Sequence, residues 1–219
     1  TTVVRNELPF PVASPVSLSL GRFDIDLESI ENGLPSNPKL KTNRQRFDLP
    51  VLLPLLDSPS LILKALGNGR DAAVKTLQST MLRFLTSLPP GKVRFTILDP
   101  VGLGANFSAF MHLADVDELL VTNRIWTEPS HIEKRLADLT EHMETVLQTY
   151  LRNEFSTIDE YNAFAGEVAE PYRVLVVANF PANFSDVALR RLASIAEGGQ
   201  KCGVFLLLSF DKSQELPRG

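Results

Sequence analysis

The sequence predicts a three-layer α/β sandwich, in which helices cover both faces of a mainly parallel central sheet. After residue 60, strand-like apolar runs alternate with helical patterns, which is the order typical of a parallel sheet. Two of these runs, "YRVLVVANF" and "CGVFLLLSF", are apolar almost throughout, as strands buried on both faces are. The chain has 219 residues, of which 44% are hydrophobic, so we expect one structural domain with one sizeable core.

The first 59 residues differ in texture from the rest of the chain. Eight prolines punctuate them and leave room only for short strands and loops, of which "SPVSLSLGR" is the clearest strand. We therefore expect residues 1–59 to form a strand and loop segment that packs on the core. Residues 60–219 are expected to form the principal part of the domain.

The principal part opens as a strand, a turn and a helix, in "SLILKAL", "GNGRD" and Ala72 to Leu88, with Pro89 and Pro90 ending the helix. A second strand, "KVRFTILDP", leads into a glycine-rich bend, "VGLGANFSAF". The clearest helix is "IEKRLADLTEHMETVLQTYL", and a further helix, "SDVALRRLASIAEGG", separates the last two strands. The apolar face of the clearest helix consists of Ile132, Leu136, Leu139, Met143, Val146, Leu147 and Tyr150.

The stretch "GRDAAVKTLQSTMLRFL", residues 69–85, has the outline of a phosphate-binding loop, G-x-x-x-x-G-K-[ST], running into a helix. Gly69, Lys75 and Thr76 stand at the positions of the first glycine, the lysine and the hydroxyl. Val74 replaces the second glycine, and its Cβ would crowd the place where phosphate approaches the backbone. We treat Gly69, Lys75 and Thr76 as a vestigial nucleotide site.

The same residues also fit an ordinary helix. In that interpretation Ala72, Ala73 and Val74 start the helix, Asp71 is its N-cap, and Lys75 lies on the solvent-exposed face. If phosphate did bind there, the Asp71 carboxylate would repel it and offset part of the attraction of Lys75.

Several weaker signals follow one another from residue 90 onward. They are the strand end "TILDP", the pair His112-Leu113, a long helix with Glu141, Met143 and Tyr150, a segment with Ile158, Tyr161 and Asn162, the pair Pro171-Tyr172 before "RVLVVAN", and a glycine-containing turn within "KCGVFLLLSFD". In this order and spacing the chain, from about Ser17, resembles the RecA-like motor domain of the FtsK/SpoIIIE family of DNA translocases and their secretion-system relatives. The resemblance implies a RecA-like P-loop NTPase fold.

The resemblance also implies that the hydrolytic residues are altered. The acidic pair of the family's Walker B strand falls at Ala178 and Asn179, and the polar sensor falls at Asp211 and Lys212. The lysine that follows Asp-Pro in many members is Val101. Because phosphoryl transfer depends on positioning and electrostatics, we expect a degenerate domain with no catalytic residues and no cofactor. The alternative is weak binding of ATP with Mg.

The run "KLKTNRQR" contains the one dense basic patch, Lys39, Lys41, Arg44 and Arg46. Such a patch could contact DNA phosphates, but a solvated linker is the simpler interpretation. No aromatic residue interleaves the run, which argues against stacking on single strands. The net charge of −4 argues against a protein-wide nucleic-acid footprint.

The other residues that could carry chemistry, one aspartate, the histidines and the cysteine, are expected to have structural roles. Asp99 is expected to cap a turn with Pro100, and His112, His131 and His142 have no spacing that builds a metal site. We place His142 beside the polar face of its helix. Cys202, the single cysteine, is expected to pack as a small hydrophobic residue.

The leading hypothesis is a non-hydrolysing interaction module that packs with other domains or subunits of an FtsK/SpoIIIE-type assembly. The alternatives are a DNA translocase subunit that binds ATP weakly and a non-catalytic DNA-binding module. The absence of a signal peptide and the single cysteine indicate the cytoplasm. Because the sequence begins with Thr1, we also consider a domain of a larger, membrane-anchored protein.

Overall fold

The computed structural model describes residues 15–55, 60–121, 124–152 and 154–216. Six strands are described: β1 (Ser17–Asp26), β2 (Arg46–Pro54), β3 (Leu61–Ala65), β4 (Val93–Leu98), β5 (Tyr172–Phe180) and β6 (Val204–Asp211). The α-helices among the described residues are α1 (Gly69–Ser87), α2 (Pro129–Thr145), α3 (Ile158–Ala165) and α4 (Asp186–Gly198). None of the helices in this part of the chain has the length and apolar character that a membrane crossing requires.

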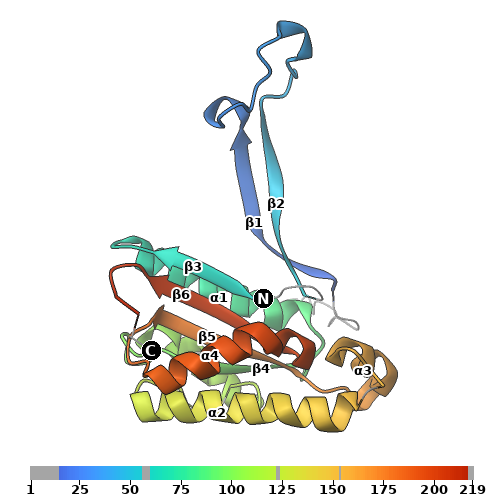
Figure 1. The fold of residues 1–219 in the computed structure, drawn as a ribbon, viewed down its shortest axis with the longest axis vertical. Helices are drawn as coiled ribbons and strands as arrows, with labels where there is room; N and C mark the ends of the chain where they lie inside the picture. The colour runs from blue at the N-terminus through green and yellow to red at the C-terminus, as the bar shows by residue number, and fades with distance from the viewer. Residues whose placement is uncertain (1–14, 56–59, 122–123, 153, 217–219) are drawn as a thin grey trace, which may run out of the picture.

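Strands β3 to β6 form one parallel sheet in the order β3-β6-β5-β4. This arrangement confirms the prediction that the four apolar runs lie side by side in one parallel sheet. The chain crosses from β3 to the opposite edge strand, β4, and then returns through β5 to β6. The carboxyl ends of all four strands therefore meet at one edge of the sheet (Figure 1).

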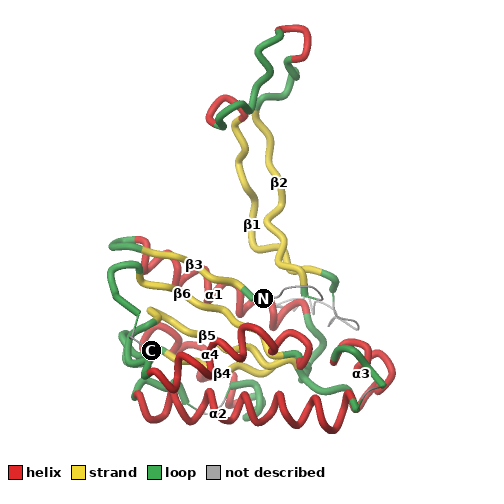
Figure 2. Tube along the Cα trace, viewed as in Figure 1, coloured by secondary structure: helices red, strands yellow, loops and turns green. Residues whose placement is uncertain are grey.

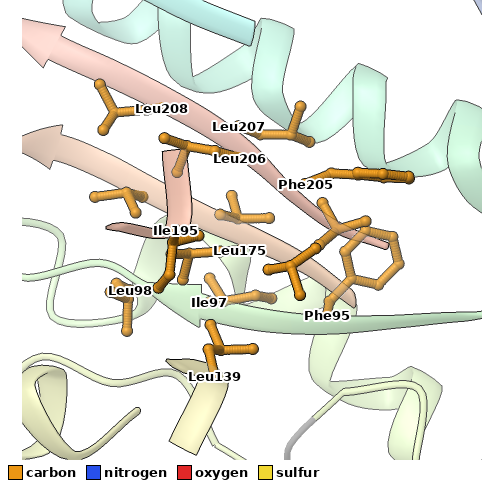
Figure 3. Close-up of a cluster of buried hydrophobic side chains, with 14 of the residues drawn as sticks. Phe95, Ile97, Leu98, Leu139, Leu175, Ile195, Phe205, Leu206, Leu207 and Leu208 are labelled. Atoms are coloured by element: carbon orange, nitrogen blue, oxygen red, sulfur yellow. The ribbon is translucent and has the colours of Figure 1, made fainter. Parts of the chain in front are cut away.

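Helix α1 covers one face of the sheet, and helices α2 and α4 cover the other (Figure 2). The core lies between these layers because the residues of β5 from Val174 onward, and nearly all of β6, are buried. Side chains from β4, β5, β6, α2 and α4 meet there (Figure 3), among them Phe95, Leu139, Leu175, Ile195 and Leu207. The predicted three-layer α/β architecture is confirmed.

The prediction for the N-terminal segment was partly wrong. In place of short strands, β1 and β2 pair over nine to ten residues as an antiparallel hairpin that projects away from the sheet (Figure 1). Only its base joins the core, through Leu18, Leu53 and Leu55. Prolines are tolerated here because each strand of a two-stranded hairpin is an edge strand with one unpaired side. Residues 1–14 and 56–59 of the segment lie outside the described residues.

Two other elements differ from their predicted form. The glycine-rich bend continues into a 3-10 helical segment, η3 (Ala105–Asp115). The clearest predicted helix ends its regular part at Thr145 and continues as a wider π-helical turn, η4 (Val146–Leu151). Leu147, which the helical spacing assigned to the apolar face, is exposed because the change of pitch rotates it out of register with α2.

Candidate nucleotide-binding edge

The residues that the family resemblance assigns to nucleotide chemistry lie at the carboxyl edge of the sheet. Gly69, Lys75 and Thr76 belong to α1, which follows β3. Asp211 ends β6, the strand beside β3, and helices α1 and α4 lie on opposite faces of this strand pair. Open α/β sheets bind ligands beyond the carboxyl ends of two such strands. A nucleotide would therefore be expected to bind where the carboxyl ends of β3 and β6 lie side by side, which we call the edge between β3 and β6.

The connection between β3 and α1 is too short to form a phosphate cradle. It consists of residues 66–68, and two backbone bonds close it as a tight turn: the Gly69 N–H donates to Leu66 O, and the Arg70 N–H to Gly67 O. Helix α1 has thus begun five residues before Val74. The N–H groups of Val74, Lys75 and Thr76 lie in the interior of a helix, where each pairs with a carbonyl four residues earlier.

The side chains of this stretch behave as those of an ordinary helix. Val74 is buried against the core, whereas Lys75 is exposed to solvent. The Thr76 hydroxyl donates to the Ala72 carbonyl, 2.8 Å away. The prediction of Asp71 as N-cap was wrong: Asn68 holds that position, and Asp71 lies in the first turn, where its negative charge favours the helix N-terminus.

An internal ion pair spans the edge between β3 and β6. Nη1 of Arg70, in the first turn of α1, lies 3.0 Å from Oδ2 of Asp211. The Asp211 side chain is 1% exposed. It also accepts hydrogen bonds from the Ser213 N–H, the Ser213 hydroxyl and the Gln214 side-chain amide. The position that the resemblance assigns to the sensor thus holds a carboxylate whose hydrogen bonds come from donors of the chain itself.

These donors lower the pKa of Asp211. The two hydrogen bonds from Ser213 contribute most, burial opposes them, and Gln214 and Arg70 assist. The carboxylate is therefore ionised at neutral pH. A phosphate placed beside it would meet a negative charge.

The positions that the resemblance assigns to the Walker B strand end carry no acid. Ala178 is buried, and the backbone N–H of Asn179 donates to the Ser209 hydroxyl at 2.8 Å, which ties the end of β5 to β6. Asn179 has a φ of 55°, and the pairing of the two strands shifts register at this point. Within the described part of the chain, no group of three or more His, Cys, Asp or Glu residues is placed to hold a metal ion.

Asp99 and the loop after β4 form a separate structure at the same edge. The carboxylate of Asp99 accepts from the Gly102 N–H and the Asn106 amide, both at 3.1 Å, so it closes the turn as predicted. A Cβ on Gly102 would lie 2.4 Å from this carboxylate, which explains why the turn contains glycine. Asp99 is buried, and its hydrogen bonds stabilise the loop that follows β4.

The basic run lies on the hairpin, far from the carboxyl edge. Lys39, Lys41 and Arg44 belong to the loop that joins β1 and β2, and Arg46 begins β2. Arg46 is partly neutralised because it lies 3.7 Å from Asp24 and 3.4 Å from Asp26. The run is thus an exposed segment that ends the loop at the tip of the hairpin and leads into β2.

His142 lies in a different environment from the one predicted. Its side chain is largely buried, 4.0 Å from Glu170, and burial together with nearby Arg173 and Arg94 lowers its pKa to about 4. The prediction that it lies beside the polar face of the helix was therefore wrong. Cys202 is buried as expected, and burial raises the pKa of its thiol to about 11.

Sequence reasoning missed Arg70. The phosphate-loop pattern assigns no role to the residue after its first glycine, and the partner of Arg70 lies 141 residues away in the chain. Asp211 was nevertheless a signal in the sequence, because a carboxylate at the end of a buried strand needs a cation or several hydrogen-bond donors nearby.

The four-stranded parallel sheet with helices on both faces has the fold of FtsK/SpoIIIE-type P-loop ATPase domains. Neither a protein-family model nor a curated protein sequence matches the chain. Several solved structures match the chain. EssC (ATPases 2 and 3) from Geobacillus thermodenitrificans is 21% identical, with a TM-score of 0.60 over 96% of this chain and 37% of that chain.

Two further structures have the same fold. The cytoplasmic domain of the type VII secretion ATPase EccC from Thermomonospora curvata is 16% identical, with a TM-score of 0.57 over 92% of this chain and 22% of its own. The conjugation coupling protein TcpA of pCW3, solved with ATPγS, is 14% identical, with a TM-score of 0.55 over 94% of this chain and 52% of its own. The chain thus spans between 22% and 52% of the length of these three chains.

Proposed function

We propose that this chain is an ATPase-fold domain that does not hydrolyse ATP and acts as an interaction module in a larger DNA-translocase or secretion-type assembly. The observation that carries the proposal is the start of α1 at Gly69. A phosphate cradle needs successive N–H groups that turn inward around the anion, and here the N–H groups of Val74, Lys75 and Thr76 are engaged within a helix.

The ion pair of Arg70 with Asp211 supports the same conclusion. It engages the Arg70 guanidinium with the Asp211 carboxylate, so that this cation is paired within the chain and not free for a terminal phosphate. Ala178 and Asn179 offer no carboxylate to hold magnesium or orient water. Without those groups the usual organisation of phosphoryl transfer is missing.

The role in an assembly rests on the relatives. The matched EssC and EccC structures include ATPases 2 and 3 of each protein, and this chain covers 37% and 30% of those structures. We propose that its partners are other domains or subunits of such an assembly. We also propose a cytoplasmic location, as in the domain of EccC whose structure is known.

A phosphate-release assay tests the loss of hydrolysis. The chain is incubated with Mg-ATP, and release is compared with that of the Lys75→Ala variant, in which the motif lysine is absent. We expect the two rates to be equal and no higher than the buffer rate. Release that is faster in the parent chain and drops in Lys75→Ala would refute the proposal.

The alternative of a weakly ATP-binding subunit is favoured by one observation, namely that Lys75 and Thr76 are exposed. The alternative of a DNA-binding module is favoured by the exposed basic tip of the hairpin. Loss of duplex DNA binding in an Arg44→Glu variant, with steep weakening by salt, would support the second alternative.

A further inference from the structure

The hairpin of β1 and β2 has two chemically different faces. Cross-strand partners share a face, and successive residues alternate between faces. One face is charged: Arg22 lies 3.5 Å from Asp48, and Arg46 contacts Asp24 and Asp26. The other face is apolar and consists of Gly21, Phe23 and Ile25 opposite Val51, Leu49 and Phe47.

The apolar face of the hairpin extends beyond the core into solvent. It continues outward from the buried pair Leu18 and Leu53, yet Phe23 is 59% exposed and its cross-strand partner Leu49 is 47% exposed. The hairpin projects away from the rest of the described chain, so the body does not cover this face (Figure 1). A two-stranded hairpin is only marginally stable alone, and an exposed apolar face of this kind marks an interaction surface.

The tip of the hairpin adds positive charge to this surface. Lys39, Lys41 and Arg44 are exposed and form no ion pair with other described residues. The charged face of the hairpin, by contrast, is neutralised internally. A partner of the hairpin should therefore be apolar and acidic.

The body of the same chain carries such a surface, on the side of the sheet that α1 covers. Residues of α1 and η3 line an apolar pocket of about 310 Å³, among them Leu82, Leu85, Phe110 and Leu113. The segment that follows this pocket exposes Val116 by 84% and Leu119 by 58%. The same segment carries Asp115, Asp117 and Glu118.

We infer that the apolar face and basic tip of the hairpin dock on the α1–η3 surface and acidic segment 115–119 of a second copy of this chain. The two surfaces match in both apolar character and charge. Because they are different surfaces, the contact runs head to tail and builds open chains or rings of copies. The inference deepens the interaction role proposed above, but the hairpin takes no part in the phosphate-release assay, so either proposal can fail alone.

Sedimentation velocity on the 219-residue chain, between about 5 and 500 µM, tests the contact, because a small interface of this kind binds in the micromolar range or more weakly. We expect concentration-dependent association that weakens as salt rises, since the charged parts are exposed. Phe23→Ser with Leu49→Ser should abolish it. Circular dichroism and thermal unfolding verify that each variant keeps its fold.

A charge exchange makes the test specific. Lys41→Glu with Arg44→Glu should raise the dissociation constant roughly tenfold, and Asp115→Lys with Glu118→Lys should do the same. Mixing the two reversed variants should restore association. The matched control, Glu141→Lys with Glu144→Lys, reverses exposed acids of α2 on the opposite side of the sheet and should have no effect.

Three results would overturn the inference. They are a monomer at all concentrations, association that the hairpin variants leave unchanged, and reversed variants that fail to associate when mixed. If Lys41→Glu with Arg44→Glu instead abolishes binding of a duplex DNA by a chain that stays monomeric, the tip is a DNA contact.

Discussion

The guanidinium of Arg70, in the first turn of α1, lies 3.0 Å from the buried carboxylate of Asp211 at the end of β6. The two residues close the edge between β3 and β6, where sheets of this topology bind ligands. In this chain the Arg70 cation and the Asp211 anion pair with each other at that edge. The fold that the chain shares with ATPase domains thus surrounds an edge where the Asp211 carboxylate is paired within the chain.

Replacing Asp211 by Ala should lower the free energy of unfolding by about 1–2 kcal/mol. Most of this loss comes from the donors of Ser213 and Gln214, because Arg70 is 44% exposed and its pairing is screened by solvent. Urea denaturation measures the change. The neighbouring Lys212→Ala, at an exposed side chain, serves as control and should change stability by less than about 0.5 kcal/mol. Equal effects of the two substitutions would contradict this account of the edge.

Protonation of His142 should make the fold less stable between pH 6.5 and 4. Its pKa is lowered to about 4 in the folded chain, so below pH 6.5 the unfolded chain takes up a proton that the folded chain does not. The free energy of unfolding should therefore fall by up to about 1.4 kcal/mol per pH unit from this site alone.

Denaturation of His142→Gln across the same pH range checks this prediction and should show a shallower slope. Parallel profiles for the parent chain and His142→Gln would exclude His142 as the origin of the decline.

Restoring the second glycine of the phosphate-loop pattern, by Val74→Gly, should not create an ATP site. The substitution instead removes a buried side chain from the interior of α1 and should cost about 2–3 kcal/mol of stability. Chemical denaturation with and without Mg-ATP measures both effects. Ser79→Gly, at an exposed position of the same helix, should cost only about 0.5 kcal/mol. A stabilising effect of ATP on Val74→Gly would show that one side chain blocks the site.

The sheet could be predicted because its strands are defined locally. Long apolar runs separated by helical patterns permit few arrangements, and "VFLLLSF" is typical of a strand buried on both faces. The length of the hairpin strands was not predicted, because prolines at positions 50 and 54 are typical of short strands and loops. Phe23 and Ile25 on β1, and Phe47, Leu49 and Val51 on β2, alternate with polar residues or proline as a two-faced strand should.

The site was harder to predict because its geometry depends on where a helix begins. The spacing of Gly69, Lys75 and Thr76 is compatible with a loop or with a helix. Burial of Ala73 and Val74 against the core, which the sequence alone does not reveal, favours the helix. The pairing of Arg70 with Asp211 joins residues that are 141 positions apart, so local sequence patterns do not predict it.

Thermal unfolding of the chain with increasing Mg-ATP tests most directly whether the start of α1 leaves room for a nucleotide. If ATP bound specifically, a concentration of a hundred times the dissociation constant would add about 2.7 kcal/mol of stability, or roughly 5 °C or more for a domain of this size. We predict no shift at millimolar Mg-ATP, in the parent chain or in Lys75→Ala. A shift of several degrees that disappears in Lys75→Ala would contradict the account.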